Sequence, residues 1–334
     1  MKKNKVNKSA HQESGKLVIS LDFELFWGMR DKTSIEKYKD NLLGVREIIP
    51  SILNLFKKYK IHTTWAVIGF IFYKDRDSLI KDLPAMKPNY ANELLSSYLY
   101  LNKIRLNNEL DHFHSAPSLI KMINNFPHQE VGTHTFSHYY CLEEGQNLET
   151  FKADLMSAIK IAKNYDIIIE SIVFPRNQFN HEYLNICKEL GIRAFRGNQS
   201  SWIYRPLKEE NVSFVIKLLR FIDRNFNITG HNTFSFNQIN KSIPINIKAS
   251  RFLYWYSKRF KVLEPLRLKR ILSDLTYAAK KGEIYHLWWH PHNFGVNQEE
   301  NVLFLEKILM HFIRLKKKYG MKSLNMGELS HSIN

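Results

Sequence analysis

Short apolar runs alternate with longer segments of helical periodicity along most of the chain. Residues 17–25 alternate strictly, with Leu21 and Phe23 on one face of a strand and Asp22 and Glu24 on the other. Further strands are expected at 61–68, 129–133, 171–175, 192–195 and 284–290, with a short one near 321–325. Helices are expected at 42–59, 117–126, 148–165, 181–190, 267–281 and 299–318. Strands that alternate with helices are typical of a largely parallel α/β architecture.

Two segments depart from this pattern. Pro50 lies within the expected helix at 42–59 and is expected to break or restart it, because proline has no N–H to donate. Residues 200–266 fit the alternation poorly, so we expect an insertion on the α/β scaffold there. Since no run of 18 apolar residues occurs anywhere, the sequence predicts no membrane-spanning helix.

Length, cysteine usage and charge narrow the class of protein. The 334 residues suit one large domain, expected over 16–334 after a basic, disordered tail at 1–15. With two cysteines and no secretory leader, the chain is expected to be cytoplasmic. The 49 lysines and arginines against 32 acidic residues give a net charge of +17. This excess favours anionic partners, or reflects a lysine-rich solvated surface.

Two pairs of polar residues lie where strands should end. Asp22 and Glu24, two positions apart on a strand, project from the same face. His134 and His138 follow the expected strand at 129–133 and, being four residues apart, can reach one metal ion. Two histidines and one carboxylate that leave coordination positions open suit a catalytic Zn²⁺ ion. The sequence therefore predicts a metal site with a second carboxylate beside it.

Two other segments add candidates to this site. In residues 284–295, Trp288 and His290 share one strand face, and aromatic rings beside polar groups suit sugar rings. Arg176 follows another expected strand. If Arg176 lies beside Asp22, its guanidinium holds that carboxylate ionised; otherwise it pairs with a surface acid. The residues alone leave both positions of Arg176 open.

The order and spacing of these residues resemble the polysaccharide deacetylases of the NodB-homology type, carbohydrate esterase family 4, over about residues 16 to 325. The family's first motif is usually TFDDG and reads SLDFE here. By this match Asp22 takes the base position and Glu24 a metal-ligand position. The second motif, H(S/T)xxH, is matched by His134 and His138, both ligands in the family. The last motif supplies an acid histidine, a position that His290 fits.

The resemblance implies a fold and a mechanism. The fold would be a distorted (β/α)7 barrel, here with an inserted segment near 200–266. The reaction would be hydrolysis of an N-acetyl group on a sugar. Water on one divalent ion, Zn²⁺ by its ligands, would attack the acyl carbon with Asp22 as base and His290 as acid. A backbone N–H near Tyr139 would help to hold the oxyanion. Arg176, in a third motif that reads PRNQ here, would tether the base.

A subgroup of the family, associated with surface-glycan biosynthesis, is resembled in two further places. Its SRFL and HLWWHPHN signatures are matched at 250–253 and 286–293. The expected partner is an N-acylated sugar or glycan, either free or linked to a phosphate-bearing carrier. Trp288 would contact the substrate, and Arg251 would grip its phosphate or carboxylate. Nucleic acid is not an expected partner.

Three alternatives stay open. A deformylase or a cyclic-imide amidohydrolase of the same fold would use the same residues. A barrel without catalysis could bind glycan or nucleic acid. Finally, residues 250–270 hold seven basic residues interleaved with aromatic ones. These either pack into the barrel with their charges solvated, or make a peripheral contact with an anionic membrane at its cytoplasmic face.

Overall fold

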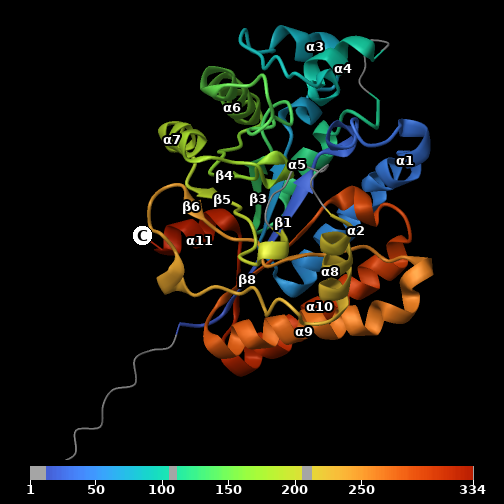
Figure 1. The fold of residues 1–334 in the computed structure, drawn as a ribbon, viewed down its shortest axis with the longest axis vertical. Helices are drawn as coiled ribbons and strands as arrows, with labels where there is room; N and C mark the ends of the chain where they lie inside the picture. Colours follow the sequence, from blue (N-terminus) through green and yellow to red (C-terminus); the bar gives the residue numbers. More distant parts are fainter. Residues whose placement is uncertain (1–12, 105–110, 205–212, 334) are drawn as a thin grey trace, which may run out of the picture.

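The strands of the described chain form a single parallel sheet at the centre of the molecule (Figure 1). This computed structural model describes residues 13–104, 111–204 and 213–333, so the tail expected over 1–15 lies outside the described residues up to residue 12. The strand order is β6-β5-β4-β3-β2-β1-β8-β7, with β9 also paired to β1, and the pairings are parallel. The strands are β1 (Lys16–Phe23), β2 (Thr63–Val67), β3 (Gln129–Thr133), β4 (Ser171–Ile172), β5 (Ala194–Phe195), β6 (Ile245–Asn246), β7 (Arg251–Phe252), β8 (Ile284–Trp289) and β9 (Lys322–Leu324).

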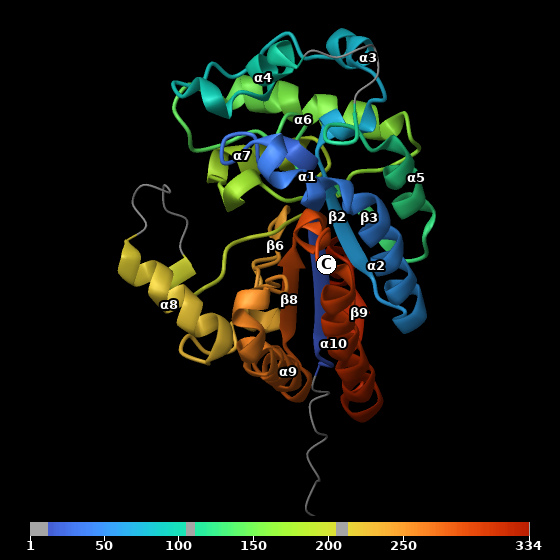
Figure 2. The same ribbon diagram turned by 90° about the vertical axis from the view of Figure 1, so that its right-hand side faces the viewer.

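Helices flank the sheet and gather beyond one of its ends. In Figure 2, α2 and α10 run alongside the strands, whereas α3, α4 and α6 lie past the end at which β1 finishes. The α-helices of the described residues are α1 (Ile35–Leu43), α2 (Val45–Tyr59), α3 (Arg76–Lys81), α4 (Ser97–Lys103), α5 (Pro117–Asn125), α6 (Leu148–Lys163), α7 (His181–Glu189), α8 (Phe214–Asn225), α9 (Glu264–Lys281), α10 (Gln298–Tyr319) and α11 (Met326–Ile333). Among these described helices, none combines the length and the apolar character needed to cross a bilayer.

The two faces of the sheet build two different cores. On β1, Leu17 and Ile19 join the large apolar cluster that packs against the outer helices. Val18 joins a second, smaller cluster formed with inward-facing residues of the other strands. Further along the inward face of β1 come Ser20 and Asp22, both buried. The interior of the curled sheet is therefore apolar where the strands begin and polar toward their carboxyl ends.

Helix α11 closes the apolar end of this interior. Met326, Leu329 and Ile333 belong to the inner cluster together with Val18. The first turn of α11 is also fixed by a buried polar contact, since the backbone N–H of Gly327 donates to the Glu130 carboxylate over 3.0 Å. The buried Ser20 and Asp22 of β1 lie toward the opposite end, where parallel-barrel enzymes carry their sites.

The expected fold is confirmed, with two local corrections. Residues 200–266 are not an insertion throughout, because β6 and β7 lie within this range and belong to the sheet. The parallel sheet curls so that its edge strands, β6 and β7, are joined by the short segment 247–250, as in a distorted (β/α)7 barrel. The break expected at Pro50 is wrong, because α2 continues through that residue. Buried side chains on both sides of the proline, among them Ile49 and Ile52, hold the helix against the sheet. Tertiary packing thus outweighs one lost backbone hydrogen bond.

Candidate active site

Glu24, His134 and His138 bring their polar atoms together at the carboxyl ends of β1 and β3. The Nε2 atoms of His134 and His138 lie 3.3 and 3.2 Å from Oε2 of Glu24. One ligand atom from each of the three side chains lies within 4.8 Å of the other two, and all three residues are buried. The structure therefore places side by side the three residues that the motif resemblance implied as ligands.

The hydrogen bonds of the two histidines indicate what kind of ligand this cluster can bind. Nδ1 of His134 lies 2.8 Å from the backbone oxygen of Val173, which can only accept, so a neutral ring presents the Nε2 lone pair to Glu24. Burial lowers the pKa of His138 to about 4, which favours a neutral ring there too. With both imidazoles neutral, the Nε2 lone pairs of the two histidines and the carboxylate oxygens of Glu24 are all acceptors, and they face one another. A divalent cation between them satisfies all three, and Zn²⁺ favours this donor set.

The charge of Glu24 is retained in spite of its burial. Burial would raise the pKa of this carboxyl, but the pKa lies well below its ordinary value, and the neighbouring His290 is the largest of the effects that oppose burial. An ionised carboxylate is the form that binds a cation.

The loop that carries both histidines is strained and firmly tied down. Thr135 and His138 adopt positive φ values of 66° and 60°, which side-chain-bearing residues rarely do. The Thr135 side-chain oxygen accepts the backbone N–H of Tyr139 over 2.7 Å. The loop also packs on the 3₁₀-helix η2 (Gly69–Phe72), in which the backbone N–H of Gly69 donates to the backbone carbonyl oxygen of Thr135 at 3.0 Å.

Helix α6 supports the same loop through one buried acid. The Asp154 carboxylate accepts the backbone N–H groups of Phe136 and Ser137 over 2.7 and 3.2 Å, and the Ser137 hydroxyl as well. These bonds over-determine the conformation that turns His134 and His138 toward Glu24.

These contacts also correct the role expected near Tyr139. Its own N–H is committed to Thr135, and its hydroxyl lies among Thr150 and the backbone oxygen of Asn147 in a buried position. Tyr139 therefore braces the loop and does not offer its N–H or its hydroxyl to a substrate.

Asp22 is held by Arg196, a residue that the sequence reasoning missed. Nη1 and Nη2 of Arg196 donate to Oδ1 and Oδ2 of Asp22 at 2.7 Å each. The guanidinium also lies 3.9 Å from the ring centre of Trp288, and it donates to the Asn177 side chain over 3.0 Å. Burial raises the pKa of Asp22, but the charge and hydrogen bonds of Arg196, together with His134 and His290, outweigh burial, so that the pKa is lowered.

Arg176 stands elsewhere than expected. It pairs with Asp31, lies 3.4 Å from Glu143, and covers the ring of Tyr140 at 4.5 Å. Arg176 follows β4, whereas Arg196 follows β5, one strand further along the sheet. The sequence signal that indicated Arg176 was a basic residue directly after an expected strand. Arg196 shows the same signal.

His290 faces both carboxylates from the end of β8. Its Nε2 lies 3.7 Å from Oδ2 of Asp22 and 3.7 Å from Oε1 of Glu24, and the side chain is partly exposed. Asn293 lies 3.4 Å from its Nδ1 and accepts the Tyr38 hydroxyl over 3.1 Å, which orients the amide. The histidine therefore has a fixed ring and retains access to solvent.

Two residues expected to contact substrate have structural partners. One face of the Trp288 ring is covered by Arg196, so this ring positions the guanidinium, and a sugar contact remains a prediction for the rest of it. Arg251 is buried and bonds Asp274 over 2.9 Å, with Asp223 at 3.7 Å. The expectation that Arg251 grips substrate is corrected, because a buried guanidinium paired to two acids is not available.

A second group with metal-binding potential lies at the other end of the strands. His62 and His128 directly precede β2 and β3, and their rings stack at 4.0 Å. Nδ1 of His62 lies 2.7 Å from the Glu328 carboxylate, which already accepts the backbone N–H of Asn325. This partly exposed group is distinct from the first and must be controlled for when bound metal is measured.

Comparison with known proteins agrees with the motifs. The family model described as polysaccharide deacetylase matches residues 39–195. This stretch includes His134 and His138, begins after Asp22 and Glu24, and ends before Arg196. Over this stretch, slightly less than half of the chain, the sequence is similar to the polysaccharide deacetylases, in agreement with the resemblance of its motifs to the NodB-homology proteins of carbohydrate esterase family 4. A search of curated proteins gave no match to the chain.

Solved structures share the fold at low identity. A Mycobacterium smegmatis protein assigned as a polysaccharide deacetylase is 11% identical over 98% of this chain and 92% of its own, with a TM-score of 0.60. A 4-alpha-glucanotransferase from Thermococcus litoralis is 10% identical over 96% of this chain and 40% of its own, with a TM-score of 0.51. One scaffold thus serves different reactions, so the reaction must be inferred from the site.

Proposed function

We propose that this protein hydrolyses the N-acetyl group of a sugar with the help of one divalent metal ion. The main observation behind this proposal is that ligand atoms of Glu24, His134 and His138 lie within 4.8 Å of one another. They stand beside Asp22, which Arg196 keeps ionised. The family match supports sugar deacetylation at this coarser level. The metal dependence, the residue roles and the substrate below are our inference.

Three side chains would hold the ion, and two others, Asp22 and His290, would transfer protons. Glu24, His134 and His138 are the proposed ligands, and Zn²⁺ is the metal that their chemistry favours. When bound there, the ion would supply a Lewis acid that activates water and polarises the acyl oxygen. Asp22, next to the cluster, would accept the proton of the attacking water, and Arg196 would hold Asp22 in the ionised state and in orientation.

His290 would supply the acid. An amine leaves an amide readily only when it is protonated, so the reaction needs a donor on the side of the nitrogen. Nε2 of His290 lies within 3.7 Å of both Asp22 and Glu24, and the exposed part of its ring can exchange protons with water. A carboxylate base and a histidine acid in unlike environments divide the two tasks.

The proposed substrate is an N-acylated sugar or glycan of surface polysaccharide biosynthesis, in the cytoplasm. The resemblance of residues 286–293 to the HLWWHPHN signature supports this choice, and the positive charge of the chain favours a phosphate-linked carrier. We also propose a peripheral contact with the inner face of a membrane, which does not depend on the proposed activity.

The decisive experiment measures acetate and formate released from free, nucleotide-linked and lipid-linked N-acyl sugars, with bound metal quantified in the same samples. Acetate release that is abolished by a chelator and restored by Zn²⁺ is the expected result. Formate release, or the opening of a cyclic imide, would assign the site to the related amide hydrolases. Glycan binding without metal or turnover would identify a non-catalytic barrel and overturn the proposal.

A further inference from the structure

Helix α8 is amphipathic, but its apolar side faces solvent and its buried residues are polar. Phe214 is 79% exposed, and Val215 and Leu218, on the same side of the helix, are exposed as well. The residues of α8 that are buried are Asp223 and Asn225. A helix at a protein surface normally buries its apolar stripe and exposes its charges. In Figure 2, α8 stands on the flank of the barrel, outside α9 and away from α2 and α10.

Polar contacts hold α8 in this orientation. The Asp223 carboxylate accepts the Tyr204 hydroxyl over 2.9 Å and the Thr229 backbone N–H over 3.0 Å. Arg251 and Arg270 each lie 3.7 Å from the same carboxylate. Because Asp223 is fully buried, rotating α8 to hide Phe214 would expose this network and break its bonds. The apolar side is therefore held toward solvent.

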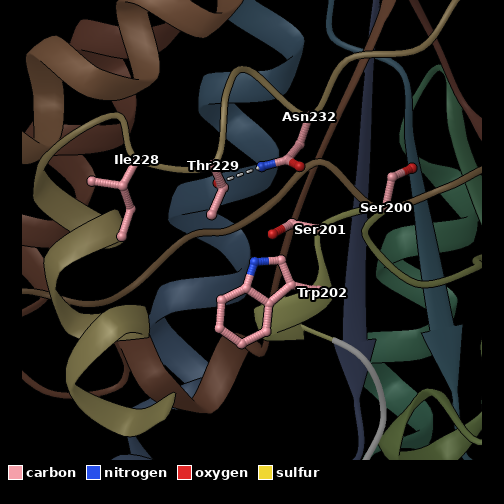
Figure 3. A pocket seen from close by; sticks show the side chains of 6 residues that line it. All are labelled: Ser200, Ser201, Trp202, Ile228, Thr229 and Asn232. Carbon is pink, nitrogen blue, oxygen red and sulfur yellow. Dashed lines mark hydrogen bonds between the residues drawn. The ribbon is translucent and has the colours of Figure 1, made fainter. Parts of the chain in front are cut away.

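Neighbouring residues extend the apolar area. Trp202 is 60% exposed, and Phe226 and Ile228 are also exposed where the chain leaves α8. Trp202 and Ile228 stand on opposite sides of a cavity of about 490 Å³ that hydroxyl and amide groups line between them (Figure 3). We call Trp202, Phe214, Val215, Leu218, Phe226 and Ile228 together the α8 surface.

Basic residues predominate in the chain from α8 to η8. Between Ser213 and Leu263 the chain has nine basic residues and a single acid, the buried Asp223. The adjacent 3₁₀-helix η8 (Lys258–Leu263) packs on α8 through Phe260 and Phe221, whose ring centres are 5.3 Å apart. Lys217 on α8, and Lys258, Arg259 and Lys261 on η8, are exposed.

Part of the basic segment expected at 250–270 does not contribute. Arg251, Arg267 and Arg270 are buried and pair with Asp274 or Glu264. Lys258, Arg259 and Lys261 remain exposed on η8, next to α8, and Lys269 remains exposed on α9. Apolar and basic exposure therefore coincide where η8 meets α8.

We propose that the α8 surface binds the face of an anionic lipid bilayer. Apolar side chains flanked by cations are the pattern of helices that lie in the membrane interface. A second copy of this chain fits less well, because a two-fold interface would set the same cations against one another. An anionic bilayer satisfies both parts, taking up the apolar side chains and pairing the cations with lipid phosphates.

The position of this surface bears on the proposed reaction. Arg196, which binds Asp22, is six residues before Trp202, so their Cα atoms lie no more than about 20 Å apart. For the deacetylase proposed above, docking here would bring the mouth of the barrel to sugars carried on lipids. This consequence rests on the proposed function, whereas the lipid contact itself does not.

The test is co-sedimentation of the full chain with phosphatidylcholine vesicles and with mixed phosphatidylcholine–phosphatidylglycerol vesicles, at low and high salt. We expect sedimentation only with the anionic vesicles, weakened by salt because the cations are screened. Phe214→Ser should lower the affinity roughly tenfold or more, since one aromatic side chain loses its burial in lipid. Lys258→Gln should lower it about fivefold.

The matched control is Ile168→Ser, which removes an apolar side chain that is 84% exposed away from α8. Its affinity for vesicles should equal that of the unmodified chain. Because Phe214 and Ile168 are both exposed, neither change should alter the melting temperature, which is checked first.

A cysteine at each position gives a second measurement. The native thiols of Cys141 and Cys187 are buried, and burial raises their pKa, so a thiol-directed dye should label Phe214→Cys or Ile168→Cys alone. The dye at position 214 should report an apolar environment on anionic vesicles, and the dye at 168 should not.

Three outcomes would overturn the proposal. The first is no binding to anionic vesicles. The second is binding that Phe214→Ser leaves unchanged, which would reflect net charge alone. The third is a dimer in sedimentation velocity that Phe214→Ser dissociates, which would assign the surface to a second copy. None of these measurements uses enzyme activity, so a failed deacetylase assay leaves them unaffected.

Discussion

Asp22 shows how opposing effects on one carboxyl set its chemistry. Burial disfavours its charged form, whereas the two hydrogen bonds from Arg196 and the charge of that guanidinium favour it. The pKa is lowered on balance, so Asp22 is ionised at neutral pH and can accept a proton. The same two contacts fix the direction in which its oxygens point.

Replacing Arg196 with lysine should therefore shift the pH profile of the reaction. A single ammonium cannot reproduce the bidentate contact, so the pKa of Asp22 rises and its ionised fraction falls on the acid side. The acid limb of kcat/KM should move to higher pH, and the rate should fall about ten- to a hundredfold with metal binding unchanged. The control Arg176→Lys should leave the limb in place, and equal shifts in both variants would contradict the assignment.

Metal content should separate ligands from proton-transfer residues. Glu24→Ala, His134→Ala and His138→Ala each remove one of three protein donors, so each should lose the ion and the increase in melting temperature that it brings. Asp22→Asn should retain the ion, because it leaves the three donors intact. Elemental analysis after dialysis, together with thermal unfolding, measures both effects.

The second histidine group provides the control for that experiment. His62→Ala should leave both the tightly bound metal and the turnover unchanged, since His62 lies before β2, at the opposite end from the proposed site. If His62→Ala instead removes the metal and His134→Ala does not, the proposed ligand set is wrong.

At the scale of elements, the strained loop 134–140 depends on α6. Asp154→Ala removes the acceptor of two backbone N–H groups and leaves them buried, which should cost about 3 kcal/mol of unfolding free energy. Without Asp154 the loop that carries His138 loses its support, so the metal affinity of the site should fall more than tenfold. Chemical denaturation and metal titration measure the two effects.

An exposed position on the same helix tests whether the effect is specific. Lys152→Ala breaks only a surface ion pair with Glu189 and should cost less than about 1 kcal/mol, with unchanged metal affinity. A similar loss in both variants would indicate a general weakening of α6.

The sequence predicted well those elements whose periodicity reflects the core. The alternation at 17–25 placed Asp22 and Glu24 on the face opposite Leu21, and four-residue spacing placed His134 next to His138. Partners that depend on strand order were not predictable. Arg196 reaches Asp22 because β5 and β1 face each other across a curled sheet, and β5 is two residues long.

The region 200–266 was hard to interpret for a different reason. Sequence patterns assume that apolar faces are buried, and α8 reverses that assumption. The aromatic and basic composition of 250–270 could not show which arginines are buried, since Arg251 pairs with residues 23 and 28 positions away in sequence.

At the scale of the whole molecule, one buried ionic network ties the insertion to the barrel. Asp274 of α9 bonds Arg251 of β7 over 2.9 Å, pairs with Arg270, and meets His231 over 2.7 Å. Asp223 of α8 joins the same network. The position of the α8 surface therefore depends on these charges more than on apolar packing.

Asp274→Ala should destabilise the protein by about 3–5 kcal/mol, because it leaves two buried guanidinium groups without their main partner. Hydrogen exchange should increase first in α8, which loses its anchor, while β1 and β2 stay protected. Lys269→Ala, an exposed change on the same helix, should alter neither stability nor exchange. Uniform loss of protection across the sheet would show that the insertion does not unfold separately.

The helix across the base of the barrel limits the shape of what can react there. With α11 in place, the barrel is a cup and not a tunnel, so a polymer cannot be threaded through it. Only a group that projects from the side or the end of a glycan can reach the bottom of the cup. The released acid must leave by the same opening while the sugar is still there or after it has gone. Widening the rim, and not the floor, is therefore the change that would admit bulkier glycans.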